Sequence, residues 1–258
     1  MRPFKAIVIV GFLALCGTAL LRTAPVAHAD TTNNCDLTPS DFAQITAIQN
    51  DPTLSALDEV RQEIAIRKSL VGQTIACAQA DVQSLQASLN SATTTDSASA
   101  NLKAQLSSRL DDAANFYTIE LTQLNGAGIA GSEAIAQEIL AWRAGSYEPL
   151  HGEVSNFILW SENQGLFATA ENRMQQTSQA VSFLEGASGN TALAAAFAAS
   201  QNSFNAASQE NNAAENALTQ YLPPGQSLAL IKQSLDSLSL TYQNFFAVTG
   251  VINTLLPQ

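Results

Sequence analysis

The fold of this chain is decided by residues 193–221, which read LAAAFAASQNSFNAASQENNAAENALTQY. A set of mostly apolar side chains recurs there at every third or fourth position: Leu193, Phe197, Ser200, Phe204, Ala207, Asn211, Ala214, Leu218 and Tyr221. That spacing places one stripe along an α-helix, and such a stripe is the seam along which the helices of a coiled coil pack. Pro223-Pro224-Gly225 follows and forces a turn. The stretch therefore predicts one arm of a long helical hairpin.

Two members of this seam, Ser200 and Asn211, are polar. A polar seam residue usually fixes the register or the number of packed helices, at some cost in stability. We therefore expect these two side chains to specify how the helices pair.

The same spacing extends over most of the chain. It recurs after the turn, in Leu228, Ile231, Leu235, Leu238, Tyr242, Phe245, Val248 and Ile252, and before it, in Leu57, Val60, Ile64, Val71, Ile75, Ala78, Val82, Leu85 and Leu89. No segment alternates apolar and polar residues as a half-buried strand does. We predict an all-α fold, an elongated antiparallel helical bundle with coiled-coil-like hairpins. Residues 30–258 would form a single domain, in which 30–128 and 129–258 could be sub-bundles.

Helix boundaries follow from capping residues, glycines and prolines. Thr38-Pro39-Ser40-Asp41 predicts a first helix that ends near Asn50, and Asp51-Pro52 predicts the start of a second. Further along, we expect a helix to end near Gly145, with Pro149 in the first turn of the next. Gly165 should kink or break that helix, and a separate one should run from Leu166 to Glu185.

The N-terminus has the order of features of a secretory signal peptide. Basic residues at Arg2 and Lys5 precede an apolar run, and Ala27-His28-Ala29 is a small-x-small cleavage pattern. We expect cleavage after Ala29 and an extracytoplasmic location: periplasmic, cell-surface or secreted. The alternative is an uncleaved N-terminal anchor, for which the apolar run is somewhat short.

Two cysteines, Cys35 and Cys77, would remain after cleavage. An even number of cysteines in an exported protein indicates a disulfide, and the expected hairpin of the first two helices brings both positions within reach. The alternative is two separate thiols. We expect no metal site, because His151 is the only remaining histidine and two thiolates do not complete a zinc site.

The mature chain would be strongly acidic, with 22 acidic against 8 basic residues and a formal net charge of −14. Nucleic acids and anionic lipid surfaces are bound by basic surfaces, so this balance argues against both. We expect no nucleic acid and no stable membrane insertion after signal cleavage. A protein partner or self-association is the expected mode of action.

Motifs that carry chemistry are missing from the sequence. It contains no glycine-rich phosphate loop, no Gly-x-Ser-x-Gly elbow and no cluster of metal ligands. The adjacent carboxylates Asp58-Glu59 and Asp111-Asp112 point in different directions on a helix, so they do not form a catalytic pair. We therefore predict no catalytic residues, no cofactor and no enzymatic activity.

The best candidate for a binding site is the aromatic segment 142–167. It contains Trp142, Tyr147, Phe157, Trp160 and Phe167, with Arg143 and His151 among them. Aromatic residues with an arginine are enriched in binding hot spots. The alternative, which we favour, is that these rings fill the core where helices change direction.

Three classes of function fit these observations. The first is a structural or protein-interaction module of the cell envelope. The second is an extracytoplasmic ligand-binding, peptide-binding or sensor bundle, with a pocket that contains Trp142 or Trp160 together with Arg143. The third is a secreted membrane-active helical protein, but its only apolar tail, residues 250–256, is too short to span a membrane.

Overall fold

A computed structural model describes residues 39–188 and 191–255. The described part is all-α and contains no strand. Its elements are α1 (Pro39–Gln49), α2 (Ala56–Ser91), α3 (Ser97–Gly126), α4 (Ile129–Trp142), the π-helical turn η1 (Arg143–Tyr147), α5 (Glu148–Ser188), α6 (Thr191–Thr219) and α7 (Pro224–Leu255). The predicted helical bundle is therefore confirmed. The coiled-coil character of its hairpins stays a prediction.

Local sequence explains where several helices begin. The Ser55 hydroxyl accepts a hydrogen bond from the Asp58 backbone N–H at 3.2 Å and caps α2. At the start of α3, Asp96 and Ser99 form a reciprocal capping box. Each cap satisfies a backbone N–H that has no partner inside its helix. Ser55 lies three residues beyond Pro52, where the sequence predicted the second helix to begin.

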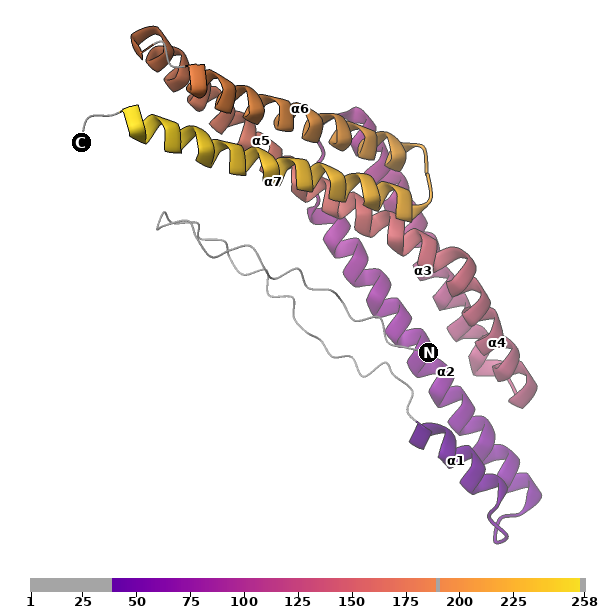
Figure 1. Cartoon of the computed structure of the whole chain (residues 1–258). Coiled ribbons are helices and arrows are strands. Elements are labelled where there is room, and N and C mark those ends of the chain that lie inside the picture. The colour runs from indigo at the N-terminus through magenta and orange to yellow at the C-terminus, as the bar shows by residue number, and fades with distance from the viewer. Residues whose placement is uncertain (1–38, 189–190, 256–258) are drawn as a thin grey trace. The chain divides into compact units, whose positions relative to one another are not determined.

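The first helices form an antiparallel arrangement (Figure 1). Hydrogen bonds from Gln79 to Thr118 and from Gln86 to Asp111 show that α3 runs against α2. α4 then runs against α3, and it is consequently parallel to α2. This parallel pair is what forms the candidate site described below.

The last three helices pack along one another, and α6 and α7 share the most extensive contact of any pair (Figure 1). A tight turn joins these two antiparallel helices, as the prolines predicted. Tyr221 occupies the left-handed region there, with φ of 54°. The Leu222 N–H donates to the Ala217 carbonyl at 3.0 Å, which closes the end of α6 as a Schellman motif does.

The main core draws on both predicted sub-bundles. It joins α2, α3, α4, η1, the first half of α5, the end of α6 and the start of α7, and it includes Ile75, Leu110, Phe157, Trp160 and Ile231. Two smaller clusters, one around Ala207 and one around Phe197, continue along α5, α6 and α7. The division into sub-bundles stays a prediction.

Three boundary predictions were wrong. The helix does not end near Gly145, because a π-helical turn carries it from α4 into α5. The Glu148 N–H bonds to the Arg143 carbonyl, five residues back, just before Pro149, which has no N–H to donate. α5 also runs through Gly165 without a break, so no separate helix starts at Leu166.

The stripe predicted for the second helix is only partly buried. Ile75, Val82 and Leu89 lie in the core, whereas Leu57 and Val60 are exposed. Glu63 and Leu70 are buried in the first half of α2 instead, because the buried face there is offset from the apolar stripe. The predicted signal peptide and Cys35 lie outside the described residues. Cys77 lies in α2, and its disulfide to Cys35 stays a prediction.

Candidate functional site

A cleft of about 550 Å³ lies between α1, α2 and α4. It is lined by Ile45 and Thr46 of α1, by Arg67, Leu70, Val71 and Thr74 of α2, by Ser132, Glu133, Ala136, Ile139 and Leu140 of α4, and by Arg143 of η1. Ligand pockets in proteins are concave, mostly apolar, and about 300–1,000 Å³ in volume. The cleft therefore has the size and the lining of a small-molecule site.

Helical spacing explains why these residues share one cleft. Arg67, Leu70, Val71 and Thr74 follow at steps of three, one and three, which places them on one face of α2. The lining residues of α4 repeat the same pattern up to Arg143. Because the two helices are parallel, the cleft follows both of them lengthwise, with an arginine at each end.

The middle of the cleft is apolar. Leu70 and Ile139 are buried, and Val71 packs against the main core. Leu140 is 74% exposed although it is a large apolar residue on the wall of the cleft. An exposed leucine gains stability when an apolar partner covers it, so this wall favours an apolar ligand.

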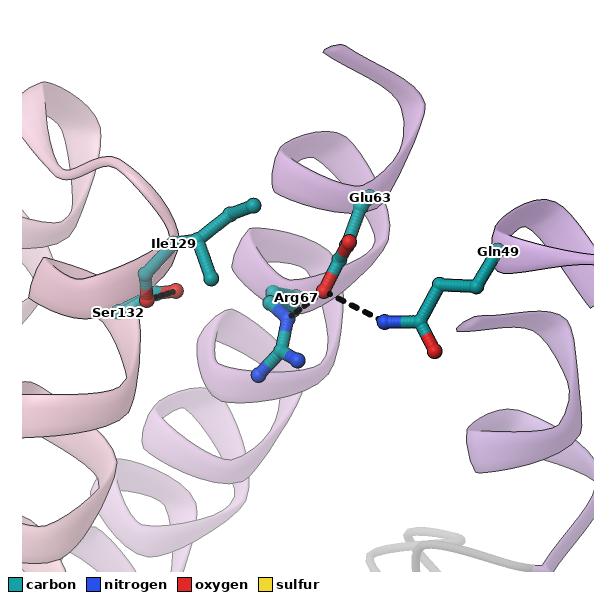
Figure 2. Close-up of polar contacts among 5 residues, drawn as sticks. All are labelled: Gln49, Glu63, Arg67, Ile129 and Ser132. Atoms are coloured by element: carbon teal, nitrogen blue, oxygen red, sulfur yellow. Dashed lines mark hydrogen bonds and ion pairs between the residues drawn. The ribbon is translucent and has the colours of Figure 1, made fainter. Parts of the chain in front are cut away.

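At one end of the cleft, Arg67 is held by a polar network (Figure 2). Its Nε donates to Glu63 Oε1 at 2.8 Å, and the same oxygen accepts from Gln49 Nε2 at 3.2 Å. Figure 2 shows Arg67 between Gln49 of α1 on one side and Ile129 and Ser132 of α4 on the other. The charge of Arg67 is thus already balanced by a buried carboxylate.

At the other end, Arg143 lies among aromatic rings. Its guanidinium is 5.2 Å from the centroid of the Tyr147 ring, and its Nη1 donates to the Tyr117 hydroxyl oxygen at 3.3 Å. The Tyr147 hydroxyl in turn donates to Asp81 Oδ2 at 2.9 Å. Burial raises the pKa of both tyrosines, and nearby Asp81 raises the pKa of Tyr147 further. Both phenols are therefore neutral hydrogen-bonding groups at physiological pH.

The π-helical turn positions Arg143. A π-helical turn inserts one extra residue into a helix, and such turns are frequent at functional sites. Here Tyr147 is fully buried beneath the turn, while Arg143 remains half-buried and reaches the cleft. Trp142, the residue before the turn, stacks on Phe116 with ring centroids 4.1 Å apart.

The structure brings four of the five predicted site residues together, because Trp142, Arg143 and His151 each lie against the Tyr147 ring, whereas Trp160 packs with Phe157. Tyr147 and Trp160 are core residues, and Trp142 packs against the core. His151 is exposed on α5, with its ring centroid 6.1 Å from that of Tyr147. The cleft contains Arg143 but neither Trp142 nor Trp160. This cleft is therefore not the predicted tryptophan-lined pocket, and a binding role for the two tryptophans stays a prediction.

The polar seam residues are both buried. Asn211 exchanges hydrogen bonds with Gln164 of α5, with N–O distances of 3.2 and 3.4 Å. The Ser200 hydroxyl donates to the Ala196 carbonyl of its own helix at 3.3 Å. Asn211 thus links α6 to α5, whereas the hydroxyl bond of Ser200 stays within α6. The role of both residues in register stays a prediction.

Sequence reasoning missed most of the cleft. The sequence pattern did not single out Arg67, Ala136 or Leu140 as site residues. The available signal was the shared pattern of two helices, each with apolar residues and an arginine on one face. That pattern identifies a site only once the two helices are known to be parallel neighbours.

Within the described residues, no three histidine, cysteine or acidic side chains gather where they could hold a metal ion. None of the helices in residues 39–188 and 191–255 is both long and apolar enough to cross a membrane. No protein family, curated protein or solved structure matches the chain. Function must therefore be argued from the cleft itself.

Proposed function

We propose that this protein is an exported, non-enzymatic helical bundle that binds a small, largely apolar ligand in the cleft between α1, α2 and α4. The observation that carries the proposal is the 550 Å³ cleft with an apolar middle and Leu140 exposed on its wall. The extracytoplasmic location rests on the signal-peptide pattern, and the acidic charge suits a carrier or sensor outside the cytoplasm.

A variant that fills the cleft tests the proposal. Ala136 lines the cleft and is half-buried, so Ala136→Phe places a ring in the ligand volume. The matched control is Ala141→Phe, an exposed position on the same helix that does not line the cleft. We expect Nile red, an uncharged apolar dye, to bind the wild type and Ala141→Phe with a fluorescence increase, and to lose at least about tenfold in affinity for Ala136→Phe.

Thermal unfolding of both variants checks that the bundle remains folded. The proposal fails if the dye does not bind the wild type. It also fails if Ala136→Phe, still folded, binds the dye as well as the control does.

The proposed disulfide between Cys35 and Cys77 would support this site. Cys77 lies on α2 beyond the cleft residue Thr74, and the cysteine before α1 would tie the start of that helix to α2. Since α1 forms one wall of the cleft, the crosslink would hold the wall in place. Titration of free thiols under denaturing conditions checks it, and two reactive thiols would contradict it.

A second candidate is the protein-interaction module. It is favoured by Phe183 of α5 and Phe246 of α7, which are 77% and 63% exposed. Large exposed aromatic residues are typical of surfaces that bind a partner. Sedimentation and crosslinking in envelope extracts test it, and a monomer that crosslinks to no protein would exclude it.

A further inference from the structure

We propose, on the basis of the ligand-binding function above, that the ligand is an amphipathic monoanion. Its anionic group would lie at Arg143, and its apolar tail would extend along α2 and α4 toward Arg67. The proposal rests on the different charge environments of the two ends of the cleft.

The Arg143 end differs, because its guanidinium forms no ion pair within the part of the chain that the structure describes. Among the described residues, the ion pairs are Arg61–Asp58, Arg67–Glu63 and Arg109–Glu153, and Arg143 is in none of them. Its polar and ring partners are a phenol oxygen and an aromatic face, which do not neutralise it. Asp81 lies in the same network, where its carboxylate accepts from the Tyr147 hydroxyl, and it forms no ion pair with Arg143. A half-buried guanidinium in this state is a site for a carboxylate or another planar anion.

The Arg67 end is unsuited to a second anion. Glu63 already pairs with Arg67, and Glu133 also lines the cleft. Glu133 directly follows Ser132, which lies on the α4 side of Arg67 in Figure 2. Two carboxylates against one guanidinium leave this end negative. The charge pattern therefore favours one anionic group, in one orientation.

The length of the cleft limits the tail. Arg143 lies ten residues after Glu133, which lines the Arg67 end of the cleft, so the two ends are about 15 Å apart along the helix. Leu70, Val71, Ala136 and Leu140 line the span between them. A single medium-length alkyl chain or a comparable flat hydrocarbon fits this span, and decanoate is a suitable probe.

Three probes with the same chain separate the charge from the apolar contact. Decanoate, decan-1-ol and decylamine are titrated by displacement of Nile red from the wild type, from Arg143→Met and from Arg173→Met. The last variant is the matched control. The Arg173 guanidinium lies 5.2 Å from the Tyr242 ring centroid, as Arg143 does from Tyr147, but it does not line the cleft.

We expect the wild type and Arg173→Met to bind decanoate about tenfold more tightly than decan-1-ol, because charge-assisted hydrogen bonds are roughly twice as strong as neutral ones. Arg143→Met should lose the preference for decanoate over decan-1-ol, and Arg143→Lys should restore part of it. Thermal unfolding checks that both variants are folded.

The outcomes distinguish failure of the anionic-ligand inference from failure of the proposed ligand-binding function. If neither Nile red nor any of the three probes binds, the ligand-binding function itself fails. If decan-1-ol binds as tightly as decanoate, or if Arg143→Met keeps the preference, the cleft binds apolar ligands and the anionic ligand is excluded. Tighter binding of decylamine than of decanoate would also overturn the inference, because it would show that the cleft prefers a cation.

Discussion

Glu120 of α3 is a buried acidic residue that should cost the fold stability. Its side chain is 2% exposed, and its Oε2 has no hydrogen-bond partner among the described residues. Burial raises the pKa of this carboxyl group, and the charge of Glu138 on α4 raises it further. A buried polar atom without a partner costs stability, and a charged one costs more. Glu120 should therefore weaken the fold whenever it is ionised.

We expect Glu120→Gln to increase the free energy of unfolding at pH 7 by about 1–2 kcal/mol, because glutamine has nearly the same shape as glutamate but carries no charge. At pH 4 the gain should shrink, because Glu120 is then protonated in the folded state. Urea unfolding at the two pH values measures it, with the exposed Glu171→Gln as control. A gain of equal size at both pH values would show that ionisation is not the cause.

Individual side chains were predictable where periodicity alone decides their burial. The stripe through Leu193, Ala207 and Leu218 is buried as its spacing indicates. The exposure of Leu57 and the burial of Glu63 were not predictable, because they depend on which helix packs against the first turns of α2. Arg143 was correctly placed beside aromatic rings, but its role at a cleft depends on the facing helix.

At the scale of the element, α5 shows how tertiary structure overrides local preference. Glycine weakens a helix interior by about 0.5–1 kcal/mol relative to alanine, which is why Gly165 suggested a break. α5 nevertheless continues, because packing against α6 and α7 stabilises it. The π-helical turn is a second such case. Gly145 and Pro149 resemble a helix end in sequence, and only the packing of Tyr147 in the core maintains the helix through them.

Two glycines of α5 give opposite predictions for the same substitution. A Cβ at Gly165 would meet nothing within 4 Å, so Gly165→Ala should stabilise the protein by about 0.5–1 kcal/mol. A Cβ at Gly152 would lie 3.0 Å from Pro224 Cβ, so Gly152→Ala should push α7 away and offset or reverse that gain. The midpoints of thermal unfolding measure the difference, and equal shifts for both variants would contradict this view of the α5–α7 contact.

At the scale of the whole molecule, the sequence predicted an acidic helical bundle. Only the structure shows which carboxyl groups are buried, with a raised pKa, and which are exposed, with a lowered pKa. Glu120 and Glu215 are partly or fully buried, and burial is the main cause of their raised pKa; Asp96 adds to it for Glu215. Asp51 and Asp96 are exposed, and hydrogen bonds from Thr53 and Ser99 lower their pKa. These two groups of carboxylates respond to pH in opposite directions.

The sign of each response sets the pH of maximum stability. Glu120 and Glu215 have raised pKa values in the folded protein. Their protonated forms therefore stabilise the fold fully below the ordinary glutamate pKa of 4.5, and this stabilisation is lost as pH rises through the folded-state pKa. Asp51 and Asp96 have lowered pKa values in the folded protein. Their ionised forms therefore stabilise the fold above the ordinary aspartate pKa of 3.8, and this stabilisation is lost as pH falls through the lowered pKa. The net negative charge also shrinks toward the pI of about 4.4, which reduces self-repulsion. We therefore expect maximum stability between about pH 4 and 5, where all three effects agree.

Urea unfolding from pH 3 to pH 8 measures this profile, and the double variant Glu120→Gln with Glu215→Gln provides the control. The variant should lose less stability than the wild type between pH 5 and pH 8, because its buried amides do not ionise. Its stability should fall as that of the wild type does when the pH drops below 3.8, because Asp51 and Asp96 become protonated as the pH passes through their lowered pKa values. A wild type whose stability instead rises steadily from pH 5 to pH 8 would show that other ionisations outweigh the two buried glutamates.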